Sequence, residues 1–144
     1  MKLGRYKLFE KREIGPADNP LLIRWALFRT PSFGIWIHKL CRSDYERAQH
    51  DHPFGFVSII LKNGYKEVTD GGILTHKPGS ILVRPAEWKH RVVIDGKPSW
   101  NLLFVGRRRR RWGFFPDGKW CWWRQYNLDS GICEEEIIHF DNKD

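Results

Sequence analysis

The stretch Gln49-His50-Asp51-His52-Pro53 stands directly before an apolar run of the chain. Side chains on an extended chain alternate between its two faces, so residues two apart point the same way. His50 and His52 would therefore present two imidazoles side by side, within reach of one metal ion. Exposed His-x-His pairs are common in proteins, so the pair predicts a metal site only if a third ligand joins it.

A third histidine follows a second apolar run. Residues 78–90 read PGSILVRPAEWKH, in which an apolar segment breaks at Pro85 and His90 comes just as the next one begins. Together the two segments resemble the two motifs of the cupin family, G-x5-H-x-H-x(3,4)-E-x6-G and G-x5-P-x-G-x2-H-x3-N. Six residues fall at the motif spacings: His50, His52, Gly64, Gly79, Pro85 and His90. The resemblance covers residues 44–94 and implies an all-β fold, the cupin-type double-stranded β-helix or jelly-roll barrel, as a single domain over residues 1–144.

Four motif positions hold other residues: Asp44 and Glu87 replace glycines, Val57 replaces the glutamate and Ile94 replaces the asparagine. Without that glutamate, the resemblance implies a three-His metal set of His50, His52 and His90, similar to that of the thiol dioxygenases within the superfamily. Neutral imidazoles suit several metals, so the expected cofactor is a divalent transition metal, with Fe(II) favoured and Zn, Ni or Mn as alternatives. A three-His set also leaves positions open for a substrate.

The rest of the chain has the pattern of an all-β protein. Short β-branched and aromatic runs alternate with turn residues, and the Asn63-Gly64 pair is a strong hairpin signal. Further turns are expected at Asp95-Gly96 and Asp117-Gly118, and short helical turns are conceivable at residues 43–49 and 134–138. The expected strands are residues 21–29, 33–40, 54–61, 65–69, 80–83, 90–94, 100–105, 112–115 and 119–123.

The expected hairpin at Asn63-Gly64 suggests a carboxylate partner for the histidines. If this turn joins two paired strands, Lys62 faces Tyr65 and Ile60 faces Glu67, and cross-strand partners share a face. Counting back from Ile60 in steps of two leads to the histidines. Tyr65 and Glu67 are therefore candidate catalytic residues on the metal face. The alternative is that Glu67 is a surface residue at the end of the hairpin.

Three further residues are candidates for substrate binding. His38 shares a strand face with apolar neighbours and would enter the barrel, whereas His76 lies in a polar turn and is expected to be exposed. Arg84 and Arg91 flank the second motif, and either guanidinium could bind a substrate carboxylate through two parallel hydrogen bonds. A structural salt bridge is the alternative for both arginines. Its expected partners are Asp44, Glu46 or Glu87.

The net charge of +8 comes largely from five consecutive arginines, residues 107–111, in a chain with eight tryptophans. Three interpretations remain open for this run. The arginines could stack on aromatic side chains within the fold, or bind a small anionic substrate. The Arg/Trp-rich segment 107–126 could also bind single-stranded nucleic acid through phosphate contacts and base stacking. We favour the structural interpretation, because the run lies between two β segments.

The cysteines and the apolar segments suggest a soluble, cytoplasmic protein. Cys41, Cys121 and Cys133 are odd in number and lack a CxxC spacing, so they are expected to be reduced thiols. The N-terminal residues carry charges throughout, unlike a signal peptide. No apolar stretch approaches the roughly 20 residues needed to span a bilayer. We expect no membrane partner.

The sequence leaves three functions open. The leading interpretation is a metal-dependent enzyme, an Fe(II)-type dioxygenase or a related metalloenzyme acting on a small anionic molecule. The first alternative is a non-catalytic cupin that binds or senses a ligand, and the second is a nucleic-acid-binding protein. Cupins often pair through edge strands, so a homodimer is also conceivable.

Overall fold

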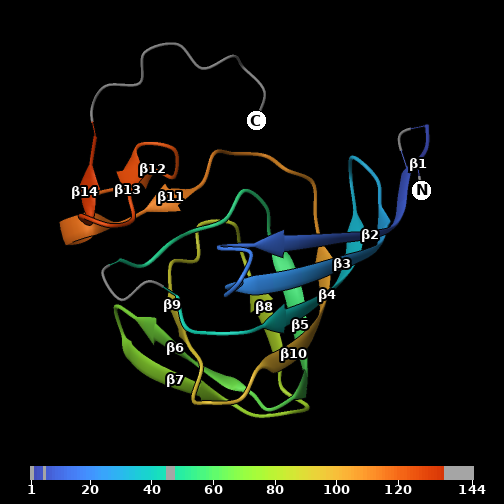
Figure 1. The fold of residues 1–144 in the computed structure, drawn as a ribbon, viewed down its shortest axis with the longest axis horizontal. Coiled ribbons are helices and arrows are strands. Elements are labelled where there is room, and N and C mark those ends of the chain that lie inside the picture. The colour runs from blue at the N-terminus through green and yellow to red at the C-terminus, as the bar shows by residue number, and fades with distance from the viewer. Residues whose placement is uncertain (1, 5, 45–47, 135–144) are drawn as a thin grey trace.

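The computed structural model describes residues 2–4, 6–44 and 48–134, and their regular structure is almost entirely β-strand. The larger sheet has seven strands in the order β1-β2-β3-β4-β10-β5-β8, and the smaller sheet has three in the order β7-β6-β9 (Figure 1). The larger sheet comprises β1 (Lys2–Leu3), β2 (Tyr6–Ile14), β3 (Leu22–Arg29), β4 (Gly34–Leu40), β5 (Phe56–Lys62), β8 (Ile81–Arg84) and β10 (Ser99–Val105). The smaller sheet comprises β6 (Tyr65–Thr69), β7 (Gly72–His76) and β9 (Arg91–Val93).

Four short strands follow the larger sheet near the C-terminal end. They lie together, away from the β6–β7 hairpin, in orange and red in Figure 1. Two antiparallel pairs make up this part: β11 (Gly113–Phe114) with β12 (Cys121–Trp122), and β13 (Tyr126–Asn127) with β14 (Ile132–Cys133). A single 3-10 turn, η1 (Pro116–Gly118), joins β11 to β12 at the expected Asp117-Gly118 turn.

The all-β prediction is confirmed, and a strand occurs in each of the nine expected regions. Five strands were not predicted from the sequence: β1, β2, β7, β13 and β14. Strand β2 was missed because five of its nine residues are charged and most are exposed. Of the expected helical turn at residues 43–49, residues 43, 44, 48 and 49 are not helical. Residues 45–47 of that turn, and 135–138 of the one at 134–138, lie outside the described part.

The core follows the alternation of β10, which lies between β4 and β5. Its buried residues alternate with partly exposed ones, so one face of the strand points into the barrel. One core cluster consists of Ala26, Trp36, Leu103 and Val105. A second consists of Ile60, Tyr65, Leu82 and Val92 and joins the two sheets.

The turn at Asn63-Gly64 forms, but the hairpin expected around it is wrong. Asn63 and Gly64 both have positive φ angles, 68° and 64°, as a tight two-residue turn requires. However, β5 pairs with β8 and β10, so both of its edges are occupied, and β6 pairs with β7 and β9. The turn therefore carries the chain from one sheet to the other. Gly64 is needed there because a Cβ would lie 2.2 Å from the carbonyl oxygen of His76.

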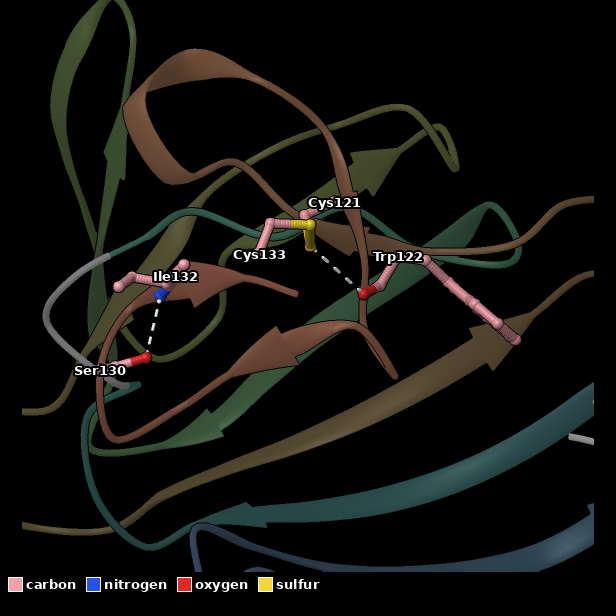
Figure 2. The surroundings of a disulfide bond; sticks show 5 residues. All are labelled: Cys121, Trp122, Ser130, Ile132 and Cys133. Atoms are coloured by element: carbon pink, nitrogen blue, oxygen red, sulfur yellow. Dashed lines mark hydrogen bonds between the residues drawn. A yellow bond between two sulfur atoms is a disulfide. The ribbon is translucent and has the colours of Figure 1, made fainter. Parts of the chain in front are cut away.

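The expectation of three reduced cysteines is wrong for two of them. Cys121 and Cys133 form a disulfide between β12 and β14 (Figure 2), and Cys41 is a free thiol. The bond lies in a small apolar cluster with Ala48 and Tyr126. The 12-residue separation of the two cysteines resembles no known motif, so their pairing depends on how β11 to β14 fold together. The expected cytoplasmic location therefore no longer has the support of three reduced thiols.

Two predictions about partners, the absence of a membrane partner and a homodimer, can be compared with the fold. Among the residues that the structure describes, no helix has the length and hydrophobicity needed to cross a membrane. Strand β8 ends the larger sheet, and its residues Ile81 and Val83 are 64% and 67% exposed. The homodimer through edge strands stays a prediction.

Candidate metal centre

His50, His52 and His90 come together in the structure. His50 and His90 form an isolated antiparallel bridge, in which the amide of each donates to the carbonyl of the other at 2.8 and 3.0 Å. Directly opposed residues of such a pair present their side chains to the same face. His52 lies two residues further along, and its amide donates to the carbonyl of Ala86 at 2.9 Å. The backbone therefore fixes all three positions.

The three imidazoles form a nearly equilateral triangle. Their ring centroids lie 4.9 Å (His50 to His90), 5.0 Å (His52 to His90) and 5.2 Å (His50 to His52) apart. One nitrogen from each ring lies within 4.8 Å of the others. The cluster that the motif spacing predicts is thus present in the structure.

The chemistry of this donor set fits a divalent transition metal. Burial lowers the pKa of His50 to about 4, although Asp44 acts in the opposite direction. Burial and the two neighbouring imidazoles likewise hold the pKa of His52 well below its ordinary value. Both rings are neutral near pH 7, as ligands to a metal must be. The cluster includes three nitrogen donors and no carboxylate.

Two carboxylates lie beside the Nδ1 atoms of His50 and His90. Oδ2 of Asp44 lies 3.3 Å from Nδ1 of His50 and also accepts a hydrogen bond from the amide of Val92 at 2.8 Å. Oε1 of Glu67 lies 3.2 Å from Nδ1 of His90, at an ion-pair distance. A carboxylate at Nδ1 orients the ring and leaves Nε2 as the nitrogen that faces the cluster.

Glu67 is held in a buried network of its own. Its side chain is fully buried, and Arg84 donates to both carboxylate oxygens, from Nη2 at 3.0 Å and from Nε at 3.4 Å. Burial alone would raise the pKa of Glu67, but the nearby His90 and the hydrogen bonds from Arg84 outweigh it and lower the pKa to about 2. The Arg84 guanidinium also lies 4.1 Å from the ring centroid of Trp88. Arg84 thus makes the salt bridge that was the alternative to substrate binding, with a partner that the sequence analysis did not name.

The predicted exposure of His76 is wrong. Its side chain is 12% exposed, and its Nε2 lies 3.5 Å from Oε2 of Glu67. The β6–β7 register sets His76 opposite Tyr65, which brings the imidazole beside the Glu67 network. This contact was not predictable without β7, which was not expected from the sequence.

Tyr65 lies on the inner face, as predicted, but inside an apolar cluster. It packs with Ile60, Leu82 and Val92 and is 8% exposed. Burial raises the pKa of the Tyr65 hydroxyl well above its ordinary value, and the negative charge of Glu67 adds to that effect. Tyr65 is therefore a neutral hydroxyl, on the same face of β6 as Glu67.

Arg91 and His38 lie apart from the three histidines. Arg91 takes the opposite face of β9 from buried Val92, and hence from His90. His38 is buried on the inner face of β4, where Nε of Arg24 donates to its Nε2 at 3.0 Å. The three expected substrate-binding residues, Arg84, Arg91 and His38, therefore do not lie together in one site.

Asp51 and Arg110 form a brace that the sequence analysis did not find. Asp51 alternates with the two histidines and so faces away from them, where it is 2% exposed. Its carboxylate accepts hydrogen bonds from Nη1 of Arg110 at 2.6 Å and from the amide of Gly113 at 2.7 Å. Arg110 also donates to the carbonyl of His52 at 3.1 Å. The arginine run thus fixes the backbone of the His50–His52 segment, and the only signal for this was the acidic residue between the histidines.

Other arginines of the run are also engaged within the protein. Arg109 pairs with Glu87, and the guanidinium of Arg111 lies 4.3 Å from the ring centroid of Trp122. These contacts favour the structural interpretation of the run over a continuous surface for nucleic acid.

Aromatic rings surround the histidine cluster. The ring centroid of Phe56 lies 4.9 Å from that of His52, while those of Trp112 and Phe114 each lie 6.2 Å from that of His50. Phe114 belongs to β11, which a second isolated bridge attaches to His50. The C-terminal strands therefore supply part of the wall around the cluster.

Comparison with known proteins identifies the fold. No family model and no curated protein matches the chain. Among solved structures, an RmlC-like cupin from Shewanella frigidimarina NCIMB 400 has a TM-score of 0.55 at 17% identity over 71% of this chain and 86% of that one. The DMSP lyase DddQ from Ruegeria pomeroyi DSS-3 has a TM-score of 0.58 at 17% identity, over 76% and 63% of the two chains. This chain has the cupin fold.

Cupin structures of proteins with different functions are similar to this chain to nearly the same degree. The Fe(II) form of HppE has a TM-score of 0.54 at 13% identity over 67% of this chain and 55% of that one. A lyase and an iron protein thus share the fold of this chain, so its reaction has to be argued from its own residues.

Proposed function

We propose that this cupin is a metal-dependent enzyme in which His50, His52 and His90 hold one divalent transition metal ion. The observation that carries the proposal is the convergence of three imidazole nitrogens within 4.8 Å, with Nδ1 of two rings already facing carboxylates. Fe(II) is the favoured metal and a dioxygenase-type reaction the favoured chemistry. When bound, such an ion supplies Lewis-acid or redox chemistry through its open coordination positions.

The neutral donor set favours a small anionic substrate. Three imidazoles contribute no negative charge, and the nearest carboxylates contact the outer nitrogens of the rings. A divalent ion held in this way keeps its full charge, which attracts an anionic ligand. Glu67 acts as a positioning residue, because it holds Nδ1 of His90 and so orients Nε2 toward the ion. The neutral Tyr65 hydroxyl lies on the same strand face and shares a hydrogen bond with Ser58.

Oxygen uptake by defined metal forms tests this function. Protein stripped with chelator would be loaded with Fe(II) or with Zn(II) without oxygen and then screened against small carboxylic acids and thiols in an oxygen electrode. We expect substrate-dependent oxygen uptake by the Fe(II) form and none by the Zn(II) form or by His52→Ala. Nitric oxide binding to the Fe(II) form, followed by visible absorption, gives a readout that needs no substrate. Uptake that is equal in the Zn(II) form would contradict redox catalysis at this centre.

A further inference from the structure

A second group of polar residues faces the interior of the barrel, apart from the three histidines. It consists of Arg24 and Arg29 of β3 and Trp36 and His38 of β4, and we call it the inner arginine cluster. The guanidinium carbons of Arg24 and Arg29 lie 3.9 and 5.2 Å from the ring centroid of Trp36. Two cationic groups thus share one aromatic side chain.

A β-bulge turns both arginines toward the interior. Arg24 and Arg29 are five residues apart, so strict alternation would place them on opposite faces of β3. The register with β4 shifts between Ala26, which faces Trp36, and Phe28, which faces Ile35. The extra residue restores the inward direction at Arg29, as bulges commonly do.

Gly34 provides the space that the inward-facing Arg29 occupies. The register sets Gly34 directly opposite Arg29. A Cβ on Gly34 would lie 2.9 Å from Cδ and 3.1 Å from Nη1 of Arg29, closer than ordinary contacts. Because residue 34 has no side chain, the Arg29 guanidinium has room to lie over Trp36.

The cluster has donors and positive charge without matching acceptors. Among the residues that the structure describes, neither Arg24 nor Arg29 forms a salt bridge with a carboxylate. Glu10 lies opposite Ala26, but its carboxylate pairs with Lys7 at 3.4 Å. Nη1 of Arg29 and Nε1 of Trp36 are buried and have no hydrogen-bond partner. Burying a charge without a counter-ion is costly, so an acceptor is expected here.

The lowered pKa of Arg24 agrees with a site that lacks its anion. Burial lowers the pKa of Arg24 to about 10, and the positive charges of Arg12 and Arg29 lower it further. Its Nε donates a hydrogen bond to the imidazole of His38, which is neutral because burial and Arg24 depress its pKa. A bound anion would remove this repulsion between the two guanidinium groups.

Aromatic side chains connect the cluster to the metal centre. The rings of Trp36 and Phe54 meet edge to face at 5.3 Å, and Phe56 contacts the ring of His52 at 4.9 Å. Phe54 and Phe56 both pack against the core cluster that contains Trp36. A molecule bound through Arg24 and Arg29 would thus have its apolar part beside aromatic rings that lead to His52.

We propose that the inner arginine cluster binds the anionic head group, a carboxylate or a phosphate, of a small organic acid with an apolar body. Arg24 and Arg29 pair with the negative charge, and Nε1 of Trp36 is a further donor. The ligand of this site would be the substrate of the proposed enzyme, and this part of the proposal rests on the proposed function. The anion binding itself requires no metal, so the two proposals can fail separately.

Titration calorimetry with metal-free protein tests the site directly. The probes are benzoate, phenylphosphate and the neutral benzyl alcohol, which share an aromatic body. We expect one of the two anions to bind with 1:1 stoichiometry and benzyl alcohol to bind far more weakly, and the preferred anion identifies the head group. Arg29→Gln should weaken binding about 10-fold or more, because it removes charge-assisted hydrogen bonds. The matched control is Arg107→Gln, an exposed arginine outside the cluster, which should bind as the unchanged protein does.

Gly34→Ala provides a second variant that changes no charge. The added methyl group would press on Arg29 and also on Cγ2 of buried Val105, at 2.9 Å. It should therefore weaken anion binding and lower the melting temperature, and a melting curve that still shows a folded protein is required for the comparison. Equal binding of benzyl alcohol, no binding of either anion to the unchanged protein, or an equal loss in Arg107→Gln would overturn the proposal. If the unchanged protein binds the anion but binds no metal when metal is added, this site is supported and only the proposed function is contradicted.

Discussion

Nδ1 of His90 lies 3.2 Å from Oε1 of Glu67, and Arg84 donates two hydrogen bonds to the same carboxylate. This contact exists because the register of β6 with β9 sets Glu67 opposite Val92, next to His90 on the inner face. The chain of contacts leads from β8 through β6 to the histidine cluster. Glu67 thus links the packing of both sheets to the orientation of one candidate ligand.

Glu67→Gln should weaken metal binding without abolishing it. Residues that orient a metal ligand typically contribute about 10–100-fold to affinity, and the amide keeps the shape of the side chain. Competition against a chromophoric chelator would measure the change. Glu87→Gln is the matched control, since Glu87 is exposed and pairs with Arg109. Equal affinities for the two variants would contradict the positioning role.

Arg84→Met should destabilise the fold through the same carboxylate. Removing one partner of a buried ion pair typically costs about 3–5 kcal/mol, because the other charge is left without compensation. Urea unfolding would measure the free energy of unfolding. The double variant Arg84→Met/Glu67→Gln should recover part of the loss, since no uncompensated charge remains. A double variant less stable than Arg84→Met would show that the pairing is not the cause.

Much of the fold was predictable from local patterns, while strand partners were not. The Asn63-Gly64 turn follows from its residues alone, but the pairing of β5 with β8 and β10 depends on long-range contacts. Glu67 was nevertheless placed on the correct face, because alternation along β6 does not depend on which strand is its partner. The expected hairpin assigned the wrong partner to β6. As a result, neither β7 nor the contact of His76 with Glu67 was predicted.

The site was predictable only where spacing decides it. The three histidines follow from motif spacing, but the brace between Asp51 and Arg110 joins residues 59 apart and resembles no motif. Arg24 and Arg29 escaped notice because strict alternation places them on opposite faces, and the bulge after Ala26 appears only once β3 and β4 are paired.

Arg110→Gln should lower stability more than Arg107→Gln. The buried carboxylate of Asp51 would lose its charged partner, and a hydrogen bond between charged groups contributes about 1.5–3 kcal/mol. Arg107 is exposed, so its substitution should change the free energy of unfolding little. Denaturant unfolding of the two variants makes the comparison. If both lose the same stability, Arg110 does not brace the histidine segment.

Binding to single-stranded DNA at several salt concentrations separates the structural role of the run from nucleic-acid recognition. We expect weak binding with no difference between these two variants. Submicromolar binding that falls steeply with salt would support recognition of phosphates instead.

Cys121→Ser should destabilise the C-terminal strands, because the disulfide closes a loop of 12 residues. A loop of this length is expected to contribute about 3 kcal/mol through the entropy of the unfolded chain. The melting temperature of Cys121→Ser should fall to that of the unchanged protein under reducing conditions. Cys41→Ser is the control and should leave the reductant effect intact, since Cys41 is a free thiol. A melting temperature that does not respond to reductant would show that the bond does not stabilise the fold.

Metal stoichiometry tests the central claim most directly. Chelator-treated protein would be titrated with Fe(II) and Zn(II) without oxygen, and the bound metal measured by elemental analysis after gel filtration. We predict one equivalent per chain for the unchanged protein, none for His52→Ala or His90→Ala, and one for His38→Gln, whose residue lies in the inner arginine cluster. Retention of a full equivalent by folded His90→Ala, or no binding by the unchanged protein, would contradict a metal centre at these three histidines.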